Sequence, residues 1–405
     1  MADLSVVFEG VRFKNPIVVS SGEPTDSLPK IRKAVDLGAG GIVVKTLTDS
    51  PAMRQLSQIS QWHILDERHD KCQGKVPRLF TLYGRSGLSA LLPDEWTAMV
   101  REAQLHAEEN DCVVIGSVGA TAVRNWVDLC RVQEDLGLKL IELNFGCPHP
   151  SEMEDTRTGM LIGQDPALMT EILEAVTDAV SVPVIAKLTP QVADVVEVAR
   201  AAKDAGAAAV TLTNRFVGFA VDIETGRPFL HSWAGVGGPW VLPLTLRWVS
   251  KVFLQGDIPI WGSNGVYDWR DVVQFLMSGA SLVQTCSAIM VRGWSVLPAM
   301  VQGLEAFMEQ KGFGTIEDMK GVAVRSAMSY SALSDLARQV AAIDHSICTQ
   351  CQRCITTCWW DALVYTEDEP AGGMQVVEEN CVGCSICTCV CPAPGAIVLS
   401  ARGLA

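Results

Sequence analysis

Short apolar stretches alternate with longer amphipathic stretches along most of the chain. Each apolar stretch has the length of a buried strand, and the stretches between them have the length and period of helices. The predicted strands are residues 17–20, 41–46, 113–117, 140–144, 184–188, 208–213, 259–262 and 282–285, and the helix patterns include 166–180, 192–205 and 270–278. Eight buried strands with intervening helices predict an α/β fold, a (β/α)8 TIM barrel.

An open doubly wound sheet is the alternative fold for the same alternation. That fold binds dinucleotides through a Gly-rich turn directly after its first strand. Ser21-Gly22-Glu23-Pro24 follows the first predicted strand and lacks that pattern. The barrel is therefore the favoured fold.

Some segments fall outside this alternation. Residues 4–13 alternate around a Glu9-Gly10 turn and predict a β-hairpin that caps the floor of the barrel. Residues 47–95 and 215–240 are long insertions after the second and sixth strands. Both follow the C-terminal ends of strands, where barrel active sites are built. A helical stretch at about 290–340 is expected to close the barrel.

The end of the chain carries one cysteine run written twice. The first is Cys348-x2-Cys351-x2-Cys354-x3-Cys358, and the second is Cys381-x2-Cys384-x2-Cys387-x3-Cys391-Pro392. This is the spacing of bacterial ferredoxins with two [4Fe–4S] clusters, in which the fourth cysteine of each run ligates the other cluster. We therefore assign one cluster to Cys348, Cys351, Cys354 and Cys391, and the other to Cys381, Cys384, Cys387 and Cys358. Zinc and disulfides are the alternatives, but zinc sites use two C-x2-C pairs.

The length of 405 residues fits a barrel followed by a small module. We expect the barrel at residues 1–312, a helical connector at 313–342 and a bacterial-type ferredoxin-like domain at 343–405. No uninterrupted apolar run reaches the roughly 18 residues of a membrane span. The N-terminus lacks the basic start and apolar core of a secretory signal.

Charge and the remaining cysteines indicate the compartment. The net charge of −14 argues against nucleic acid and anionic membranes. It suits a soluble electron-transfer protein, and a solvated acidic surface explains it equally well. Six scattered cysteines are not among the eight predicted cluster ligands, namely Cys72, Cys112, Cys130, Cys147, Cys286 and Cys389. They need reduced thiols, so the sequence predicts a cytoplasmic protein.

Polar residues at the C-terminal ends of the predicted strands are the candidates for a barrel active site. They are Ser20, Ser21, Lys45, Thr46, Asn144, Cys147, Lys187, Thr213, Asn214, the segment 262–265, Cys286 and Ser287. Lys45 and Lys187 end otherwise apolar strands. A buried unpaired lysine is costly, so each is predicted to face an anion or an electron-rich ring. A salt-bridged structural lysine is the alternative.

The ends of the seventh and eighth strands indicate a phosphorylated cofactor, because barrels commonly bind phosphate there through backbone N–H groups. FMN fits, since the clusters carry single electrons, organic redox needs two, and a flavin converts between them. The predicted FMN-binding residues are Ser20, Ser21, Lys45, Thr46, Lys187, Gly238, Gly265, Cys286 and Ser287. We expect the two lysines at the edge of the flavin ring and the last four residues near its phosphate.

Several motifs resemble those of the dihydroorotate and dihydropyrimidine dehydrogenase family. The segment 141–149, IELNFGCPH, is similar to the N-x-S-C-P motif of that family, and 186–190, Thr213-Asn214 and 283–289 follow in the family's order. With the double cysteine run, the chain resembles the flavin-plus-cluster catalytic part of dihydropyrimidine dehydrogenase, especially the bacterial form in which this part is a separate subunit. The resemblance implies that Cys147 is the general acid/base and that Asn144 and Asn214 are catalytic residues.

A thiol at Cys147 also suits that chemistry. Reduction of a C=C bond beside a carbonyl needs a hydride from the flavin on one face and a proton on the other. A thiol with an unperturbed pKa of about 8.5 is protonated at neutral pH and can deliver this proton. An inert buried cysteine is the alternative. Residues 150–163 are expected to form a mobile lid over the substrate.

The chain departs from the family in ways that bear on its substrate. In the pyrimidine-reducing family, the insertion after the second strand supplies an Asn and a Glu, whereas residues 83–87, YGRSG, offer neither. The serine of N-x-S-C-P is Gly146, a Thr is replaced by Arg215, and a phosphate-loop glycine by Asn264. These changes predict weak recognition of pyrimidines. Arg85 and Arg215 suggest a substrate with a carboxylate or other anionic group, although surface arginines are common.

The favoured function is an FMN-dependent oxidoreductase subunit that reduces or oxidises a C–C bond beside a carbonyl in a small substrate. Electrons would pass through the two clusters. The chain shows no fingerprint for FAD or NAD(P), so we expect an oligomeric complex with an FAD/NAD(P)-binding subunit, or a ferredoxin, as partner. The alternatives are an electron-transfer subunit without substrate chemistry and a true NAD-linked dihydropyrimidine dehydrogenase catalytic subunit.

Overall fold

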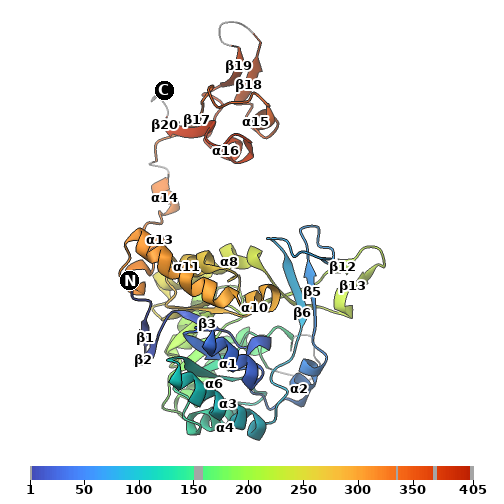
Figure 1. Ribbon diagram of the computed structural model, residues 1–405, viewed down its shortest axis with the longest axis vertical. Helices are drawn as coiled ribbons and strands as arrows, with labels where there is room; N and C mark the ends of the chain where they lie inside the picture. Colours follow the sequence, from blue (N-terminus) through green and yellow to red (C-terminus); the bar gives the residue numbers. More distant parts are fainter. Residues whose placement is uncertain (1, 150–157, 334–335, 368–371, 402–405) are drawn as a thin grey trace. The chain divides into compact units, whose positions relative to one another are not determined.

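The computed structural model describes residues 2–149, 158–333, 336–367 and 372–401. The chain forms two compact units, Met1–Ser326 and Ala327–Ala405 (Figure 1). Residues 313–326, expected to begin a connector, belong to the first unit by their contacts. The predicted boundaries at 312 and 342 remain a prediction.

The first unit contains a closed barrel of eight parallel strands, as the alternating pattern predicts. The strands are β3 (Ile17–Val19), β4 (Gly41–Val43), β7 (Val113–Val118), β8 (Ile141–Asn144), β9 (Val184–Lys187), β10 (Ala209–Leu212), β15 (Ile260–Ser263) and β16 (Leu282–Thr285). They follow one another around the barrel in chain order, and β16 pairs with β3 to close it. The (β/α)8 barrel is confirmed, and the open doubly wound sheet is excluded.

Helices cover the outside of the barrel between successive strands (Figure 1). They include α1 (Leu28–Asp36), α3 (Pro93–Glu109), α4 (Val123–Asp135), α6 (Pro166–Thr177), α7 (Val195–Asp204), α8 (Leu242–Gln255), α9 (Trp269–Met277) and α11 (Val296–Lys311). The three helices predicted at 166–180, 192–205 and 270–278 are confirmed with shifted ends. Asp165, Asp194 and Asp268 accept backbone N–H bonds at the starts of α6, α7 and α9, which fixes where these helices begin.

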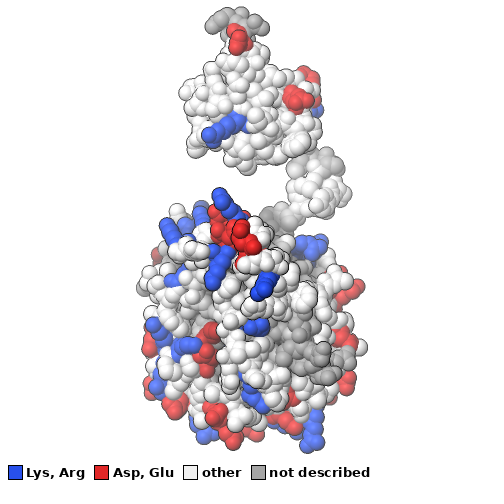
Figure 2. Space-filling view, turned by 90° about the vertical axis from the view of Figure 1, so that its right-hand side faces the viewer, with Lys and Arg blue, Asp and Glu red and all other residues white. Residues whose placement is uncertain are grey.

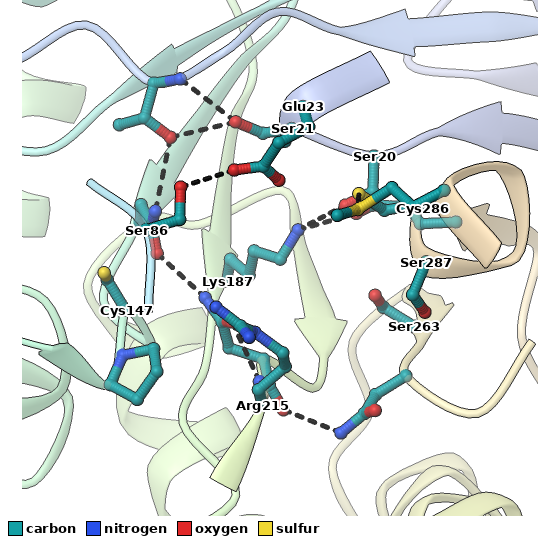
Figure 3. A pocket seen from close by; sticks show the side chains of 18 of the residues that line it. Ser20, Ser21, Glu23, Ser86, Cys147, Lys187, Arg215, Ser263, Cys286 and Ser287 are labelled. Atoms are coloured by element: carbon teal, nitrogen blue, oxygen red, sulfur yellow. Dashed lines mark hydrogen bonds between the residues drawn. The ribbon is translucent and has the colours of Figure 1, made fainter. Parts of the chain in front are cut away.

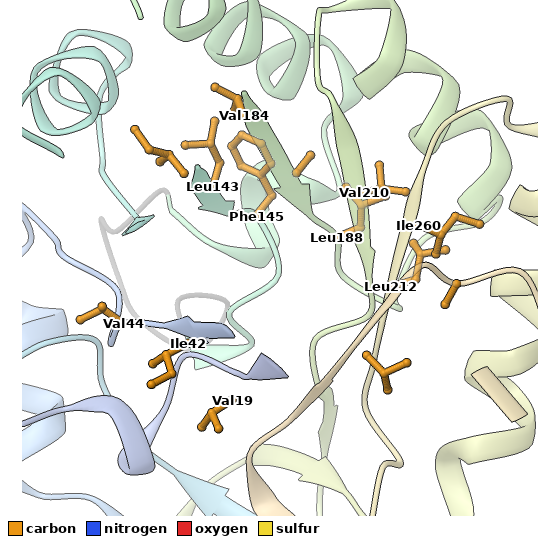
Figure 4. Close-up of a cluster of buried hydrophobic side chains, with 14 of the residues drawn as sticks. Val19, Ile42, Val44, Leu143, Phe145, Val184, Leu188, Val210, Leu212 and Ile260 are labelled. Atoms are coloured by element: carbon orange, nitrogen blue, oxygen red, sulfur yellow. The ribbon is translucent and has the colours of Figure 1, made fainter. Parts of the chain in front are cut away.

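Side chains along each strand point alternately toward the helices and into the barrel. Outward residues such as Val19, Ile42 and Leu212 are fully buried in the core between strands and helices (Figure 4). The lowest inward layer is apolar and contains Val18, Val43, Ile115, Leu140, Ile185, Ala209, Trp261 and Leu282. Two residues further along the same strands, the inward positions are Ser20, Lys45, Ser117, Glu142, Lys187, Thr211, Ser263 and Gln284. The period of the strands therefore brings a layer of polar side chains to the C-terminal end of the barrel.

The N-terminal hairpin closes the opposite end. Its strands are β1 (Val6–Phe8) and β2 (Val11–Phe13), which pair antiparallel. Phe8 and Phe13 contact the ring of Trp261 edge-on, with centroid distances of 5.3 and 6.2 Å, and belong to the apolar layer. The predicted hairpin and its place on the barrel floor are confirmed.

The two long insertions pair with each other. Residues 47–95 contain α2 (Pro51–Gln58), β5 (Gln61–Leu65) and β6 (Thr81–Arg85), and the later insertion contains β11 (Phe216–Gly218) and β14 (Ala234–Gly237). These four strands form an antiparallel sheet in the order β11-β14-β6-β5. We call it the insertion sheet. Its pairing joins segments about 150 residues apart, as in the partnership of Gly84 and Gly235.

Short elements complete the first unit. They are η1 (Glu23–Thr25), α5 (Met160–Gly163), β12 (Val221–Asp222), β13 (Arg227–Pro228), η3 (Phe229–His231), η4 (Pro239–Val241), α10 (Ser287–Arg292), α12 (Ile316–Met319) and α13 (Val322–Arg325). Residues 150–157 of the expected lid lie outside the described residues.

The second unit is built around two small antiparallel sheets. β17 (Gln339–Ile343) pairs with β20 (Ile397–Ala401), and β18 (Leu363–Thr366) pairs with β19 (Gly373–Val376). Its helices are α14 (Tyr330–Leu333), α15 (Arg353–Thr356) and α16 (Ile386–Val390). Val340, Leu363 and Met374 pack with the buried thiols Cys354, Cys381 and Cys387 in its core. The cysteine runs therefore provide much of the interior of this unit.

Charged side chains of both signs are interspersed over the visible face of the first unit (Figure 2). Within the described ranges, the helices are all too short or too polar to span a membrane.

Candidate active site

The C-terminal end of the barrel and the insertion sheet border a polar pocket (Figure 3). The residues that the sequence singled out and that line it are Ser20, Ser21, Lys45, Thr46, Asn144, Cys147, Lys187, Thr213, Asn214, Arg215, Gly265, Cys286 and Ser287. Glu23, Trp62, Ser86 and His149 also line the pocket, although the sequence did not single them out as site residues. The pocket thus gathers side chains from most barrel strands and from both insertions.

Arg85 and Gly238 are not among the residues that line this pocket. Arg85 lies on β6 and donates to the carbonyl of Leu230 at 3.2 Å and to Oε1 of Gln61 at 3.1 Å. A Cβ at Gly238 would lie 2.3 Å from the Phe80 carbonyl oxygen, so this glycine permits a close backbone approach. Arg85 and Gly238 therefore support the structure of the two insertions, and neither is brought to the predicted site.

Both strand-end lysines are buried and paired with carboxylates. Nζ of Lys187 lies 3.1 Å from Oε1 of Glu142, and Nζ of Lys45 lies 3.1 Å from Oε1 of Glu23. Burial of an ammonium group is tolerable when such a partner is present. These contacts match the alternative in which each lysine is a salt-bridged structural residue, yet both lysines also line the pocket. Their predicted contact with the flavin ring remains a prediction.

Glu23 places a carboxylate in the pocket from the loop after β3. Lys45 and the hydroxyl of Ser86 both donate to its Oε1 atom. Burial raises the pKa of Glu23, but Lys45, the Ser86 hydrogen bond and Arg215 outweigh burial and hold this pKa below its ordinary value. The group therefore stays ionised at neutral pH. Its position three residues past a strand end was the only signal in the sequence.

Arg215 links the insertion sheet to the catalytic loop. Its Nη1 atom donates to the carbonyls of Gly84 and Gly235, and its guanidinium lies 4.6 Å from the centroid of the Trp62 ring. Its Nη2 atom lies 3.1 Å from Nε2 of His149. Burial, then Arg215, depress the pKa of His149 well below its ordinary value. His149 is therefore neutral and accepts this bond, while Arg215 keeps its charge.

Cys147 is a buried thiol between apolar and cationic neighbours. Only 7% of its surface is exposed, and it packs against Met53 and Leu88. Burial raises the pKa of Cys147, and the backbone N–H of His149 and the charge of Arg215 oppose this. The thiol is thus protonated at neutral pH, and the groups beside it stabilise the thiolate that remains after proton donation. A general acid needs this combination.

A chain of amides and hydroxyls crosses the pocket beside Cys147. Asn144 donates to Oγ1 of Thr46 at 3.2 Å and accepts from Nδ2 of Asn214 at 3.2 Å. Thr46 lies 3.0 Å from Ser21, and Asn264 donates to the carbonyl of Asn214. These contacts fix the two predicted catalytic asparagines side by side.

The loop after β15 fits the phosphate of a cofactor. Gly265 and Val266 line the pocket, and their N–H groups have no backbone acceptor among the described residues. Asn264 and Gly265 have φ angles of 74° and 95°, and successive amides in such a turn form an anion-binding concavity. Asn tolerates this left-handed conformation, so Asn264 replaces a glycine without changing the loop. The pocket therefore combines amide donors from this loop with the ammonium groups of Lys45 and Lys187, a donor set that fits FMN.

The cysteines of the second unit lie in two groups. One small cavity is lined by Cys358, Cys381, Cys384 and Cys387. In the other group, burial raises the pKa of the Cys354 thiol, and the neighbouring Cys348, Cys351 and Cys391 raise it further. The fourth cysteine of each run thus lies with the other run. The groups are those predicted as ligand sets, and their ligation of the clusters remains a prediction.

A barrel with a buried thiol and a phosphate-binding loop, followed by a double-cluster cysteine unit, defines the class of iron–sulfur flavoprotein oxidoreductases. The family model described as dihydroorotate dehydrogenase matches residues 74–308, and a model described as a 4Fe-4S dicluster domain matches residues 341–399. The chain belongs to the dihydroorotate dehydrogenase family. It is an oxidoreductase acting on CH–CH bonds, and its cofactors are FMN, which this family binds, and two [4Fe–4S] clusters.

Individual relatives cover most of the chain. A protein of Pyrococcus horikoshii described as dihydroorotate dehydrogenase B (NAD(+)), catalytic subunit, is 33% identical over 324 residues, which is 80% of this chain and 98% of the relative. A protein of Methanothermobacter thermautotrophicus with the same description is 33% identical over 317 residues, 77% of this chain and 96% of the relative. The NAD-dependent dihydropyrimidine dehydrogenase subunit PreA of Escherichia coli is 29% identical over 369 residues, 88% of this chain and 85% of that subunit.

Proposed function

We propose that the chain is the catalytic subunit of a redox complex that reduces or oxidises a C–C bond beside a carbonyl in a small anionic substrate. The observation that carries this proposal is the protonated, buried thiol of Cys147 in the same pocket as the phosphate-binding loop and Arg215. FMN supplies hydride exchange with the substrate and single-electron exchange with the clusters. An electron-relay subunit would need no acid in this pocket.

Each group in the pocket has a distinct part in this proposal. Cys147 gives a proton to, or takes one from, the substrate carbon. Asn144 and Asn214, held by their mutual hydrogen bond, orient the polar groups of the substrate. Arg215 attracts its anionic group. Glu23 stands near Arg215 as the opposite charge, so a substrate meets an acceptor and a donor.

The substrate is proposed to differ from simple pyrimidines. Ser86 occupies the insertion where the pyrimidine-reducing family supplies Asn and Glu, and its hydroxyl is bonded to Glu23. Glu23 brings a carboxylate to the pocket from another loop, and the residues 83–87 of the insertion contribute no Asn or Glu. Uracil, thymine and orotate are therefore expected to be poor substrates, because a ring loses most of its recognition when its paired hydrogen bonds are missing.

The electrons are proposed to enter or leave through the second unit. The relatives described as NAD(+)-linked catalytic subunits suggest a partner subunit that binds FAD and NAD(P), with a soluble ferredoxin as the other candidate. The chain holds fourteen cysteines, and none of them forms a disulfide. Free thiols and iron–sulfur clusters both favour the cytoplasm as its compartment.

An anaerobic half-reaction without any partner tests the function. Full-length protein loaded with FMN and clusters is mixed with saturated carboxylic acids that have a carbonyl beside the C–C bond. Bleaching of the flavin together with formation of the unsaturated acid is the expected result. If none of them bleaches the flavin, and a reduced ferredoxin still reduces the clusters, the chain is an electron-relay subunit.

A further inference from the structure

A buried ion pair lies at the floor of the pocket. Lys187 donates to Oε1 of Glu142 at 3.1 Å, to Oε1 of Gln284 at 2.8 Å and to Oγ of Ser20 at 2.9 Å. An ammonium group has three N–H bonds, so each of them has an acceptor within the protein. Figure 3 shows Lys187 reaching toward Ser20 in the middle of the pocket.

Both carboxylate oxygens of Glu142 accept hydrogen bonds, just as every N–H bond of Lys187 has an acceptor. Glu142 has no exposed surface. Its second oxygen, Oε2, accepts from Oγ1 of Thr211 at 2.8 Å and from Nε2 of Gln284 at 2.6 Å. A buried charge is stable only with such a full set of partners. The hydrogen bonds therefore fix the carboxylate of Glu142 directly behind the lysine.

The two charges differ in their access to the pocket. Lys187, Gln284 and Ser20 line it, whereas Glu142 is not among its lining residues. A cofactor in this pocket thus meets the positive end of a pair whose negative end lies behind it. The field that it feels is the difference between the two charges, not that of a lone cation.

We propose that Glu142 is a positioning residue that sets the redox potential of FMN by compensating the charge of Lys187. Two-electron reduction of a flavin with uptake of one proton adds one negative charge to it. An uncompensated cation nearby would favour the reduced form, and Glu142 limits this preference. The potential stays low enough for electrons to pass between the flavin and the clusters, whose own potentials depend on their protein surroundings.

Two single substitutions separate charge from structure. Glu142→Gln removes the negative charge, so the flavin potential should become more positive. Lys187→Met removes the positive charge, so the potential should become more negative. A tenfold change in the preference for reduced over oxidised FMN corresponds to about 30 mV for a two-electron couple. The double variant Glu142→Gln/Lys187→Met carries no net change in charge and should lie between the two single variants.

The potential is measured by anaerobic spectroelectrochemistry on the full chain loaded with FMN and clusters. The ratio of the affinities of the protein for reduced and oxidised FMN is a second readout. Glu102→Gln serves as the control, because Glu102 is an exposed partner of Arg32 on the outside of the barrel. No substrate is needed, so the result does not depend on the proposed reaction.

Shifts of opposite sign for the two single variants, with Glu102→Gln at the wild-type potential, would support the proposal. Shifts of the same sign, or a Glu142→Gln potential equal to that of the control, would overturn it. If Glu142→Gln does not fold alone, Lys187→Met is compared with the double variant, in which a neutral pair replaces the ion pair. At alkaline pH, where Glu142 is ionised even without Lys187, the same negative charge separates these two proteins, and equal potentials there would again overturn the proposal.

Discussion

At the scale of single residues, the strand period decides which side chains reach the pocket. Val43 and Ile185 point into the barrel, so Lys45 and Lys187, two residues further on, must do so too. Asn144 is the last residue of β8, two residues past the inward Glu142, and Cys147 lies in the loop that follows. The chemistry of the site therefore follows from parity along the strands together with the residue types at their ends.

Removal of the thiol tests the role of Cys147. Cys147→Ala should retain FMN and both clusters but lose steady-state turnover by about 100- to 10,000-fold, the contribution of one positioned acid. Cys147→Ser should retain part of the activity, since a hydroxyl occupies the same position. Stopped-flow spectra should show flavin reduction through the clusters at the normal rate and slow reoxidation by substrate. Unchanged turnover would make Cys147 a packing residue.

The raised pKa of Cys147 predicts opposite pH dependences for the two reaction directions. Substrate reduction needs the thiol, which persists up to the raised pKa. Its rate should therefore stay flat through neutral and mildly alkaline pH. Substrate oxidation needs the thiolate, whose fraction rises about tenfold per pH unit below that pKa. Single-turnover rates in both directions measure this, and a fall in the reduction rate near pH 7 would contradict it.

Arg215 and Arg85 form a matched pair for testing anion recognition. Arg215→Gln should raise the KM for an anionic substrate roughly 10- to 100-fold, because a charge-assisted hydrogen bond contributes about 1.5–3 kcal/mol. Arg85→Gln should leave KM unchanged, since Arg85 bonds to Leu230 and Gln61 away from the pocket. Steady-state kinetics with the substrate and its amide would show the difference. Equal effects of the two substitutions on KM would contradict the proposed role of Arg215 in binding the anionic group.

Sequence reasoning found the strand-end residues but not their partners. The sequence predicts Lys45, Asn144, Cys147 and Lys187 as site residues, because each lies at or shortly after the end of a short apolar run. Glu23 could not be predicted, because its role depends on Ser86, which is 63 residues away in the chain. His149 lies within a recognisable motif, yet its lowered pKa comes from burial and then from the charge of Arg215, which reaches it from a distant segment. Contacts between loops that are far apart in the chain leave no pattern in the local sequence of either loop.

At the scale of elements, the barrel was predictable and the insertion sheet was not. Each barrel strand is buried on both faces and reads as an apolar run. β5 and β11 are partly exposed, β6 and β14 are mostly buried, and the four strands lie in two separate insertions. Their pairing depends on close contact between side chains and backbone, as at Gly84, where a Cβ would lie 1.9 Å from the Trp62 ring.

Gly84 is predicted to be essential for the shape of the insertion sheet. Gly84→Val should displace Trp62 and with it the stacked guanidinium of Arg215. Such overpacking costs about 1–3 kcal/mol of folding free energy. Substrate binding should weaken while FMN stays bound, because the phosphate loop lies on β15. Thr81→Val, on the same strand, is the control. Denaturant unfolding and flavin content measure the two effects, and wild-type substrate binding in Gly84→Val would contradict the prediction.

At the scale of the whole molecule, the chain joins a two-electron site to single-electron carriers. The barrel unit holds the pocket with Cys147, and the second unit holds both cysteine groups. The double run could be read from sequence because its spacing repeats. That the fourth cysteine of each run lies with the other run could be predicted only from the known ferredoxin pattern. The structure shows the same two groups of cysteines, which experiments can test.

Cluster content should follow the crossed pairing of the cysteines. The anaerobic protein should contain about eight iron and eight sulfide, four of each per cluster. Cys391→Ser should damage the cluster of Cys348, Cys351 and Cys354, since Cys391 lies beside Cys354. Cys389→Ser should retain all the iron, because Cys389 is exposed and occupies a spacer position between Cys387 and Cys391. Iron analysis and electron paramagnetic resonance of the reduced protein measure the loss.

Double variants identify which cluster is lost. If Cys391 and Cys348 serve the same cluster, the double variant Cys391→Ser/Cys348→Ser should lose no more iron than either single variant. Cys391→Ser combined with Cys381→Ser should lose nearly all of it, because Cys381 lies with Cys358, Cys384 and Cys387. The reverse pattern would mean that each run serves its own cluster. Zinc in place of iron under anaerobic handling would contradict both cluster assignments, since the redox route through this unit requires iron.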